Sequence, residues 1–148
     1  MEYSQIFQVL WADIDPNMHL RHTAYNDYAA QVRVSFLADH GFSPKRFAEM
    51  AIGPILFREE TRFLKEVGIN EKIKVDYHCA AIRKDGSRWK GVHSIWKEDG
   101  VQAAIITVEG AWIDINARKL AIPPPDLLEV INKIPHTADF EYIPDKHH

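Results

Sequence analysis

The spacing of apolar residues predicts one long helix near the start of the chain. Between residues 25 and 40 apolar side chains recur at helical spacing, and Ala30 and Val34 widen the apolar face. Thr23 is a suitable N-cap residue before this segment, and Gly41 is suited to the position after its end. Because apolar residues cover so much of its circumference, we expect the helix to be wrapped by other elements.

Shorter apolar periods predict strands on both sides of this helix. Residues 3–11 alternate loosely, and after Pro54 the apolar period falls to two. Four further strands are expected, over residues 55–64, 72–82, 88–97 and 101–115. Turn sequences at 68–70, 85–86 and 99–100 separate them, so the four strands are predicted to form an antiparallel meander.

Two short helices complete the predicted order of elements. One begins at Ser43-Pro44, and the other is capped by Asp126 after the proline triplet at 123–125. We expect a single domain over residues 1–135 and a polar tail over residues 136–148. The order strand, long helix, four-strand meander predicts an α+β fold with one sheet around one helix.

Composition narrows the possible functions. The chain has 148 residues, 46% of them hydrophobic, which suits one domain with a sizeable core. A formal net charge of −3 without a long basic run argues against nucleic-acid binding. Cys79 is the one cysteine, so no intramolecular disulfide can form, and we expect Cys79 to be a core residue. The chain shows no secretion signal and no long apolar stretch, which predicts a cytoplasmic protein that does not insert in membranes.

The segment from Trp11 to Tyr25 holds the densest set of reactive side chains and lies between the first strand and the long helix. A helix N-terminus carries unpaired backbone N–H groups and a positive dipole end, which suit an oxygen that becomes negative during acyl transfer. We therefore expect an oxyanion site at His22 and Thr23. Asp15, just upstream, is suited to act as general base or nucleophile on the same carbonyl.

The motif Asp13-Ile14-Asp15-Pro16, followed by His22 and Tyr25, resembles the signature of the 4-hydroxybenzoyl-CoA thioesterase-like branch of the hotdog superfamily. The resemblance extends over nearly the whole chain, including an Ile122-Pro123 pair after the last strand. It implies a hotdog fold and hydrolysis of an acyl-CoA or acyl-carrier-protein thioester. It also implies that Asp15 is the catalytic carboxylate, that His22 is a candidate for assisting water, and that helix N-terminal amides polarise the carbonyl.

The same resemblance implies a homodimer, or a tetramer built from two dimers, with the site at the subunit interface. No metal or redox cofactor is implied, and coenzyme A enters only as part of the substrate. The sequence departs from the family pattern at two places. Many members carry Gly-His or Gly-Val where Met18-His19 stands, and Ala30 occupies a helix position that is often acidic.

Other residues are candidates for holding the substrate. Coenzyme A carries phosphates, for which Arg83, Lys84, Arg88 and Lys90 around the predicted 85–86 turn supply cations, although these residues also suit a solvated hairpin tip. Tyr25 is a candidate substrate contact, although a tyrosine at this helical spacing is more often a core residue.

Competing interpretations remain at this stage. Asp13, Asp15, His19 and His22 include metal-ligand types, but their spacing is not a strong zinc signature. A non-catalytic hotdog protein that binds acyl-thioesters or assists an assembly is the main alternative function. A hotdog hydratase or dehydratase is a second alternative, although its typical histidine-containing helix signature is missing from the sequence.

Overall fold

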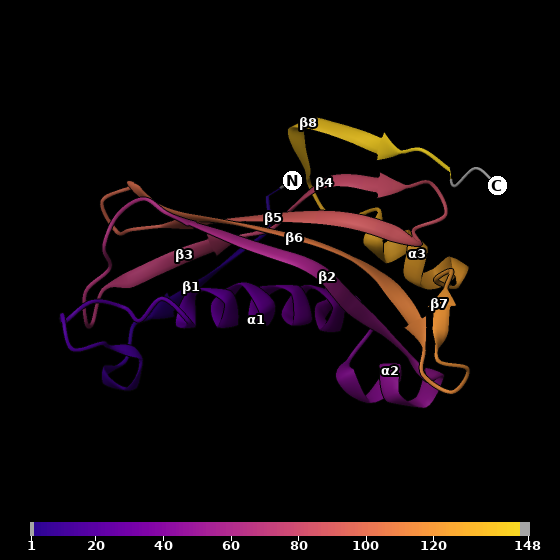
Figure 1. The fold of residues 1–148 in the computed structure, drawn as a ribbon, viewed down its shortest axis with the longest axis horizontal. Coiled ribbons are helices and arrows are strands. Elements are labelled where there is room, and N and C mark those ends of the chain that lie inside the picture. The colour runs from indigo at the N-terminus through magenta and orange to yellow at the C-terminus, as the bar shows by residue number, and fades with distance from the viewer. Residues whose placement is uncertain (1, 146–148) are drawn as a thin grey trace.

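A computed structural model describes residues 2–145 and shows a curled, mainly antiparallel sheet packed on one long helix (Figure 1). The helices are α1 (Ala24–Asp39), α2 (Pro44–Met50) and α3 (Pro125–Ile131), with a 3-10 turn at Trp11–Asp13. The strands are β1 (Ser4–Gln8), β2 (Ile52–Phe63), β3 (Lys72–Asp76), β4 (His78–Arg83), β5 (Arg88–Trp96), β6 (Gln102–Asp114), β7 (Lys119–Ala121) and β8 (His136–Ile143). The predicted α+β class and the sheet around a long helix are confirmed.

Helix α1 agrees closely with the predicted helix. Its buried residues include Ala29, Val32 and Phe36, which recur at the spacing that places side chains on one helix face. Gly41 follows the helix with a φ of 94°, a backbone conformation that glycine adopts without a Cβ clash. Val34 lies on another face and is 44% exposed, so the apolar circumference of the helix is not fully covered within the described residues.

The sheet order differs from a four-strand meander. Strands β4, β5 and β6 pair in chain order, but β2 pairs with β6 and not with β3. Residues 64–71 therefore carry the chain across the sheet from β2 to β3, which lies between β1 and β5. The prediction of a β2–β3 hairpin is wrong because turn residues mark where a chain turns and carry no information about which strand it joins.

The predicted strand over residues 72–82 is divided at Tyr77 into β3 and β4. Its apolar residues are buried as predicted, from Ile73 at 0% exposed to Ala81 at 7%. Asp76, at a polar position of the alternating pattern, is nevertheless only 9% exposed. Its carboxylate accepts hydrogen bonds from the Ser94 N–H and the Trp96 indole N–H, which compensates for the loss of water.

The two ends of the described chain also differ from the prediction. Strand β1 ends at Gln8, and Trp11 is 71% exposed instead of lying in the strand. Residues 136–143, predicted as a polar tail, form β8, which pairs in parallel with β4. The final three residues of that predicted tail, 146–148, lie outside the described residues.

The short helices α2 and α3 test the predicted caps. The Ser43 hydroxyl accepts a hydrogen bond from the Arg46 N–H at 3.1 Å, as expected of the N-cap of α2. In α3 the N-cap position belongs to Pro124 and not to Asp126. The Asp126 carboxylate instead pairs with Arg46 at 2.7 Å, which ties the two short helices together.

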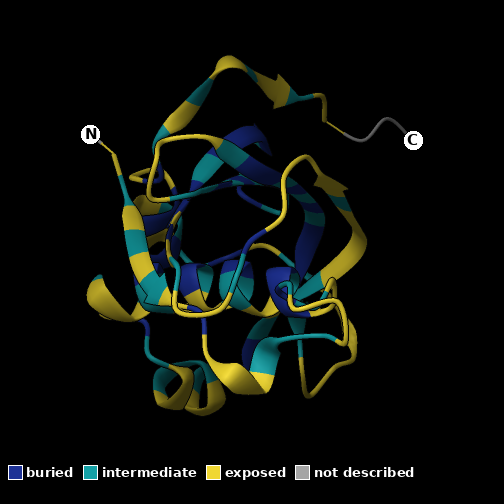
Figure 2. Cartoon of the chain, turned by 90° about the vertical axis from the view of Figure 1, so that its left-hand side faces the viewer, coloured by how far each residue is buried: buried dark blue, intermediate teal, exposed yellow. Residues whose placement is uncertain are grey.

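Buried residues lie between the sheet and α1, and exposed residues concentrate on the outer loops and on α2 (Figure 2). The largest fully buried side chains include Phe36 of α1 and Ile73, Ile95 and Ile106 of the sheet. Strand β2 pairs only with β6 among the described strands, so its other edge is open over Ile52–Phe63. No helix within residues 2–145 is both long enough and apolar enough to cross a membrane.

Candidate active site

Backbone hydrogen bonds fold the loop between β1 and α1 on itself and join it to the segment that follows β2. The Asp15 N–H donates to the His19 carbonyl at 2.9 Å, and the Leu20 N–H donates to the Val67 carbonyl at 2.7 Å. The Arg21 N–H closes the loop by donating to the Asp13 carbonyl at 2.8 Å. These bonds hold Asp15 in a defined position beside the N-terminus of α1.

The Asp15 carboxylate is held through one of its two oxygens. Oδ1 accepts hydrogen bonds from the backbone N–H of Asn17 at 2.9 Å and of His19 at 3.2 Å. The described residues place no hydrogen bond on Oδ2. The chain makes this turn with Met18 at a φ of 66°, in the left-handed region that favours glycine. The departure from the family pattern at Met18 is thus accommodated by backbone strain.

Asp13, two residues earlier, has a different environment. Its Oδ1 pairs with the Arg21 guanidinium at 3.0 Å, and its Oδ2 accepts the Tyr28 hydroxyl at 3.0 Å. Burial and this hydrogen bond raise the pKa of Tyr28 to about 12. Both carboxylate oxygens of Asp13 are therefore occupied by side chains, whereas Oδ2 of Asp15 accepts no hydrogen bond from the described residues.

A cleft of about 260 Å³ lies beside Asp15. One wall comes from the loop and α1, including His22 and Tyr25, and the other comes from Phe63 to Glu66 at the end of β2. The full lining is Asp15, His19, Leu20, His22, Tyr25, Phe63, Leu64, Lys65 and Glu66. The structure thus brings together three of the predicted site residues in one solvent-accessible site.

Tyr25 lines the cleft together with Asp15 and is affected by its charge. The Tyr25 side chain is 4% exposed and packs edge-to-face against Phe63, with ring centroids 5.1 Å apart. Its pKa is raised first by burial and next by the negative charge of Asp15. Tyr25 is therefore both a core residue and part of the cleft wall.

The start of α1 offers unpaired backbone donors. The Ala24 N–H donates to the Arg21 carbonyl at 3.0 Å, but within the described residues no backbone hydrogen bond begins at the N–H of His22 or Thr23. Thr23 occupies the N-cap position without a side-chain capping bond, because its hydroxyl accepts a hydrogen bond from Arg21. The predicted N-cap position at Thr23 is confirmed, but its hydroxyl makes no capping bond among the described residues, and the N–H groups expected for an oxyanion remain available.

The four loop residues weighed as metal ligands do not converge. Asp13 is engaged by Arg21 and Tyr28, and His19 Nε2 lies 3.0 Å from Glu66. In the described part of the chain no group of three or more His, Cys, Asp or Glu side chains is arranged to hold a metal ion.

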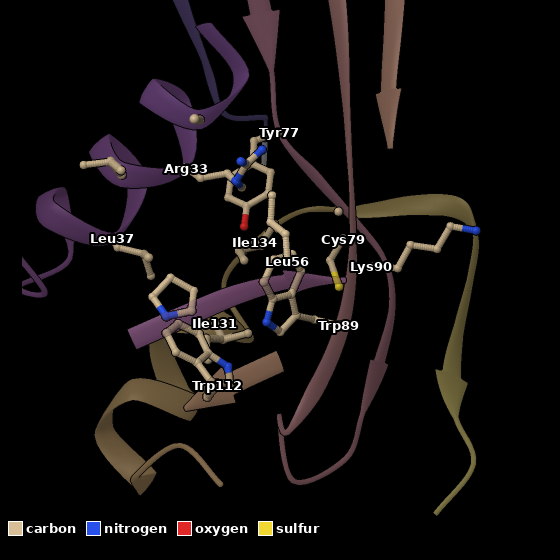
Figure 3. A pocket seen from close by; sticks show the side chains of 14 residues that line it. Arg33, Leu37, Leu56, Tyr77, Cys79, Trp89, Lys90, Trp112, Ile131 and Ile134 are labelled. Carbon is tan, nitrogen blue, oxygen red and sulfur yellow. The ribbon is translucent and has the colours of Figure 1, made fainter. Parts of the chain in front are cut away.

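The predicted cations lie at the opposite end of the sheet from Asp15 (Figure 1). The 85–86 turn packs against Pro123 and Leu128 beside α3. Arg88 stacks on Phe57 at 4.7 Å, Lys84 lies 5.5 Å from the Tyr142 ring, and Arg83 donates to Ser87. Lys90 borders an apolar cavity between α1 and the sheet, and its amine extends away from that cavity (Figure 3). Within one chain, these residues do not meet the Asp15 cleft.

Sequence reasoning missed the second wall of the cleft. Phe63, Leu64, Lys65 and Glu66 lie more than forty residues after Asp15 in the chain. The position of this segment depends on the pairing of β2 with β6 and on the Leu20–Val67 hydrogen bond. In the sequence, these residues are marked only by the end of the predicted strand over residues 55–64. The end of a strand does not specify which distant segment it will contact.

Comparison with known proteins agrees with this geometry. A family model described as the thioesterase-like superfamily matches residues 9–131. The chain belongs to the thioesterase-like superfamily. The prediction of a hotdog thioesterase is thereby confirmed at the level of family. A search of curated proteins found no match.

Solved structures show the same fold at low sequence identity. A hypothetical protein from Staphylococcus aureus, solved in complex with CoA, superposes with a TM-score of 0.86 at 22% identity, covering 95% of this chain and 90% of that one. A DHNA-CoA thioesterase from Staphylococcus aureus gives 0.80 at 19% identity, covering 89% of each chain. A 1,4-dihydroxy-2-naphthoyl-CoA thioesterase from Synechocystis gives 0.81 at 16% identity, covering 90% and 97%. These matches confirm the hotdog fold.

Proposed function

We propose that this chain hydrolyses an acyl-CoA thioester, with Asp15 as the catalytic carboxylate. The proposal rests above all on one arrangement: a carboxylate with a free oxygen stands in a cleft beside unpaired N–H groups at the start of α1. Acyl transfer needs both a base or nucleophile and donors for the carbonyl oxygen. CoA in the Staphylococcus aureus neighbour supports a CoA ester over other thioesters.

In the proposed reaction, the thioester oxygen accepts hydrogen bonds from the N–H groups of His22 and Thr23. Asp15 Oδ2 takes a proton from a water molecule as that water attacks the carbonyl carbon. The resulting tetrahedral oxyanion collapses, the carbon–sulfur bond breaks, and the proton passes from Asp15 to the thiolate. In the alternative route, Oδ2 itself attacks the carbonyl carbon and the thiolate leaves. Water then hydrolyses the mixed anhydride that joins Asp15 to the acyl group. His22 lines the cleft, where it is placed to orient the water.

The open edge of β2 supports a homodimer in which two β2 strands pair, with a tetramer of two dimers as the larger form. Leu56 and Phe57 are 43% and 52% exposed on this strand, and a second copy would cover apolar surface of this kind. Arg83, Lys84, Arg88 and Lys90 remain candidates for the CoA phosphates only if a second copy brings them to the cleft. Free, buried Cys79 suits a reducing, cytoplasmic setting.

Asp15→Asn tests the proposal directly. Release of CoA from a panel of aliphatic and aromatic acyl-CoA esters should fall by a factor on the order of 10²–10⁴, the usual contribution of a general base. Asp27→Asn is the matched control, because Asp27 is a carboxylate in the first turn of α1 whose side chain is 74% exposed and does not line the cleft.

Wild-type turnover by the Asp15→Asn variant would exclude Asp15 as the catalytic carboxylate. If the wild-type chain instead binds acyl-CoA esters without hydrolysing any member of the panel, the non-catalytic binding function is supported. Size-exclusion chromatography of both variants checks that assembly is unchanged.

A further inference from the structure

A second cavity lies between α1 and the sheet (Figure 3). It shares no lining residue with the cleft beside Asp15. Its volume is about 170 Å³, and its walls are mainly apolar. Arg33 of α1, Tyr77, and the two tryptophans Trp89 and Trp112 contribute its polar groups. A cavity of about 150 Å³ accommodates one benzene molecule, so this cavity has room for a compact apolar group.

Two buried hydrogen-bond donors at this cavity have no partner. The indole N–H groups of Trp89 and Trp112 are both buried and unpaired within residues 2–145, and Trp112 is 3% exposed overall. The Tyr77 hydroxyl points into the same space (Figure 3). An indole N–H can only donate, and burying it without an acceptor costs about 1–3 kcal/mol. The cavity is therefore short of acceptor oxygens.

Arg33 adds a positive charge that forms no ion pair with a carboxylate among the described residues, although the charge of Glu59 acts on it from beyond ion-pair distance. Its guanidinium lies 3.0 Å from His93 Nε2, and it takes part in none of the salt bridges that the described residues form. His93 Nδ1 lies 2.7 Å from the Asp76 carbonyl and donates to it, so Nε2 accepts from Arg33. Arg33 is partly buried, and an arginine that is withdrawn from water is usually paired with an acid.

His93 supplies no counter-charge. Burial, and next the charge of Arg33, lower the pKa of His93 to about 3, so the imidazole is neutral at physiological pH. Burial likewise lowers the pKa of Arg33, and the negative charge of Glu59, which acts in the opposite direction, does not offset this loss of water. Within the described residues, the cavity thus combines apolar walls, hydrogen-bond donors without acceptors, and a cation without an ion-pair partner.

The cavity and the Asp15 cleft lie along the same seam between α1 and β2. Tyr25 and Phe63 belong to the cleft, whereas Ala30, Arg33 and Leu56 belong to the cavity. Between them, the Thr61 hydroxyl donates to the Asn26 side chain at 2.6 Å. Arg33 follows Tyr25 by eight residues, or about 12 Å along the helix axis. An acyl group that reaches from the cleft to the cavity would run along this seam, past Asn26 and Thr61.

We propose that this cavity receives the far end of the acyl group and that this end carries a carboxylate, which pairs with Arg33. The identity of the ligand as an acyl group rests on the proposed thioesterase function. The carboxylate oxygens accept hydrogen bonds from the indole and phenol donors, and the methylene chain fills the apolar walls. The substrate class is then the mono-CoA ester of a dicarboxylic acid.

Kinetics with shape-matched substrates test the carboxylate. Mono-CoA esters of dicarboxylic acids with four to ten carbons are compared with neutral esters whose terminal carboxylate is replaced by an isopropyl group, such as adipoyl-CoA against 6-methylheptanoyl-CoA. The wild type should favour the carboxylated ester by about 30-fold or more in kcat/KM at its best length, the usual effect of a buried charge pair. Arg33→Met should remove this preference by slowing only the carboxylated ester. Equal rates in the wild type, or an equal loss for both esters in the variant, would overturn the inference.

Binding of the free acids separates this inference from the proposed function. Adipate binding, followed by calorimetry and by the fluorescence of Trp89 and Trp112, should be lost in Arg33→Met and kept in Asp15→Asn. If no thioester is hydrolysed but Arg33-dependent binding persists, the thioesterase proposal fails and the carboxylate site stands. If hydrolysis is normal but no diacid from four to ten carbons binds, the carboxylate site fails alone.

Ala30→Glu provides an internal test. Ala30 lines the cavity three residues before Arg33, a spacing at which helical side chains meet, so a glutamate there should occupy Arg33. We expect weaker adipate binding and a higher unfolding temperature. Unchanged adipate binding would contradict the site. Dissociation of the oligomer by Arg33→Met, with substrate preference unchanged, would assign Arg33 to a subunit contact and overturn the proposal.

Discussion

Asp13→Asn should destabilise the protein by removing the charge that ties the catalytic loop to α1. The Asp13 carboxylate contacts the Arg21 guanidinium and the Tyr28 hydroxyl, each at 3.0 Å. Asparagine has nearly the same shape but is neutral and cannot accept on both of its terminal atoms. The loop backbone bonds around Asp13 are left in place, so the substitution isolates the side-chain contribution.

The expected magnitude follows from the exposure of the two contacts. The Arg21 side chain is 37% exposed and that of Asp13 is 24% exposed, so the ion pair is screened and contributes about 0.5 kcal/mol. The hydrogen bond from the partly buried Tyr28 to a carboxylate contributes about 1.5 kcal/mol. The sum of about 2 kcal/mol corresponds to a fall in unfolding temperature of roughly 4–8 °C for a domain of this size.

Thermal unfolding followed by circular dichroism measures the loss, with Asp27→Asn as the control. Asp27 Oδ2 lies 3.8 Å from the same Arg21 side chain, but the Asp27 side chain is 74% exposed, so its variant should lose less than about 0.5 kcal/mol. Alkaline titration by ultraviolet absorbance should also show a lower pKa for Tyr28. An Asp13→Asn variant with unchanged stability and no hydrolase activity would reverse the assigned roles of Asp13 and Asp15.

Two further predictions concern stability. Folded His93 has a pKa of about 3 against an ordinary 6.5, so between these values the unfolded chain binds a proton that the folded chain lacks. The free energy of unfolding of the wild type should therefore fall by about 1.4 kcal/mol per pH unit, as the pH decreases, relative to that of His93→Asn. Urea unfolding of both proteins between pH 6 and pH 4 measures this difference. A difference that stays constant over this range would contradict the prediction. Met18→Gly should raise the free energy of unfolding by about 0.5 kcal/mol. The substitution relieves the backbone strain at a φ of 66°, which outweighs the added entropy of the unfolded chain, and little packing is lost because the Met18 side chain is 52% exposed. A clear destabilisation would refute this prediction.

Local patterns in the sequence determined most elements of the fold. The helical spacing of Ala29, Val32 and Phe36, and the alternation from Ile73 to Ala81, express how side chains project from a helix or a strand, and this depends on neighbours only a few residues away. The same holds for the loop before α1, where Asp15, His22 and Tyr25 are close in the chain and meet in the cleft. The fold class and part of the candidate site could therefore be predicted.

Only the tertiary structure decided which distant segments meet. The pairing of β2 with β6, the second wall of the cleft at Phe63–Glu66, and the addition of β8 to the sheet all depend on contacts between residues far apart in the chain. The different environments of Asp13 and Asp15 arise in the same way, from Tyr28 on the helix and from the open cleft. The sequence places Arg33 on the long helix, and only the packing of α1 against the sheet partly withdraws its charge from water and sets it beside His93. Solvation, hydrogen-bond partners and counter-charges are properties of the packed chain, and no local pattern encodes them.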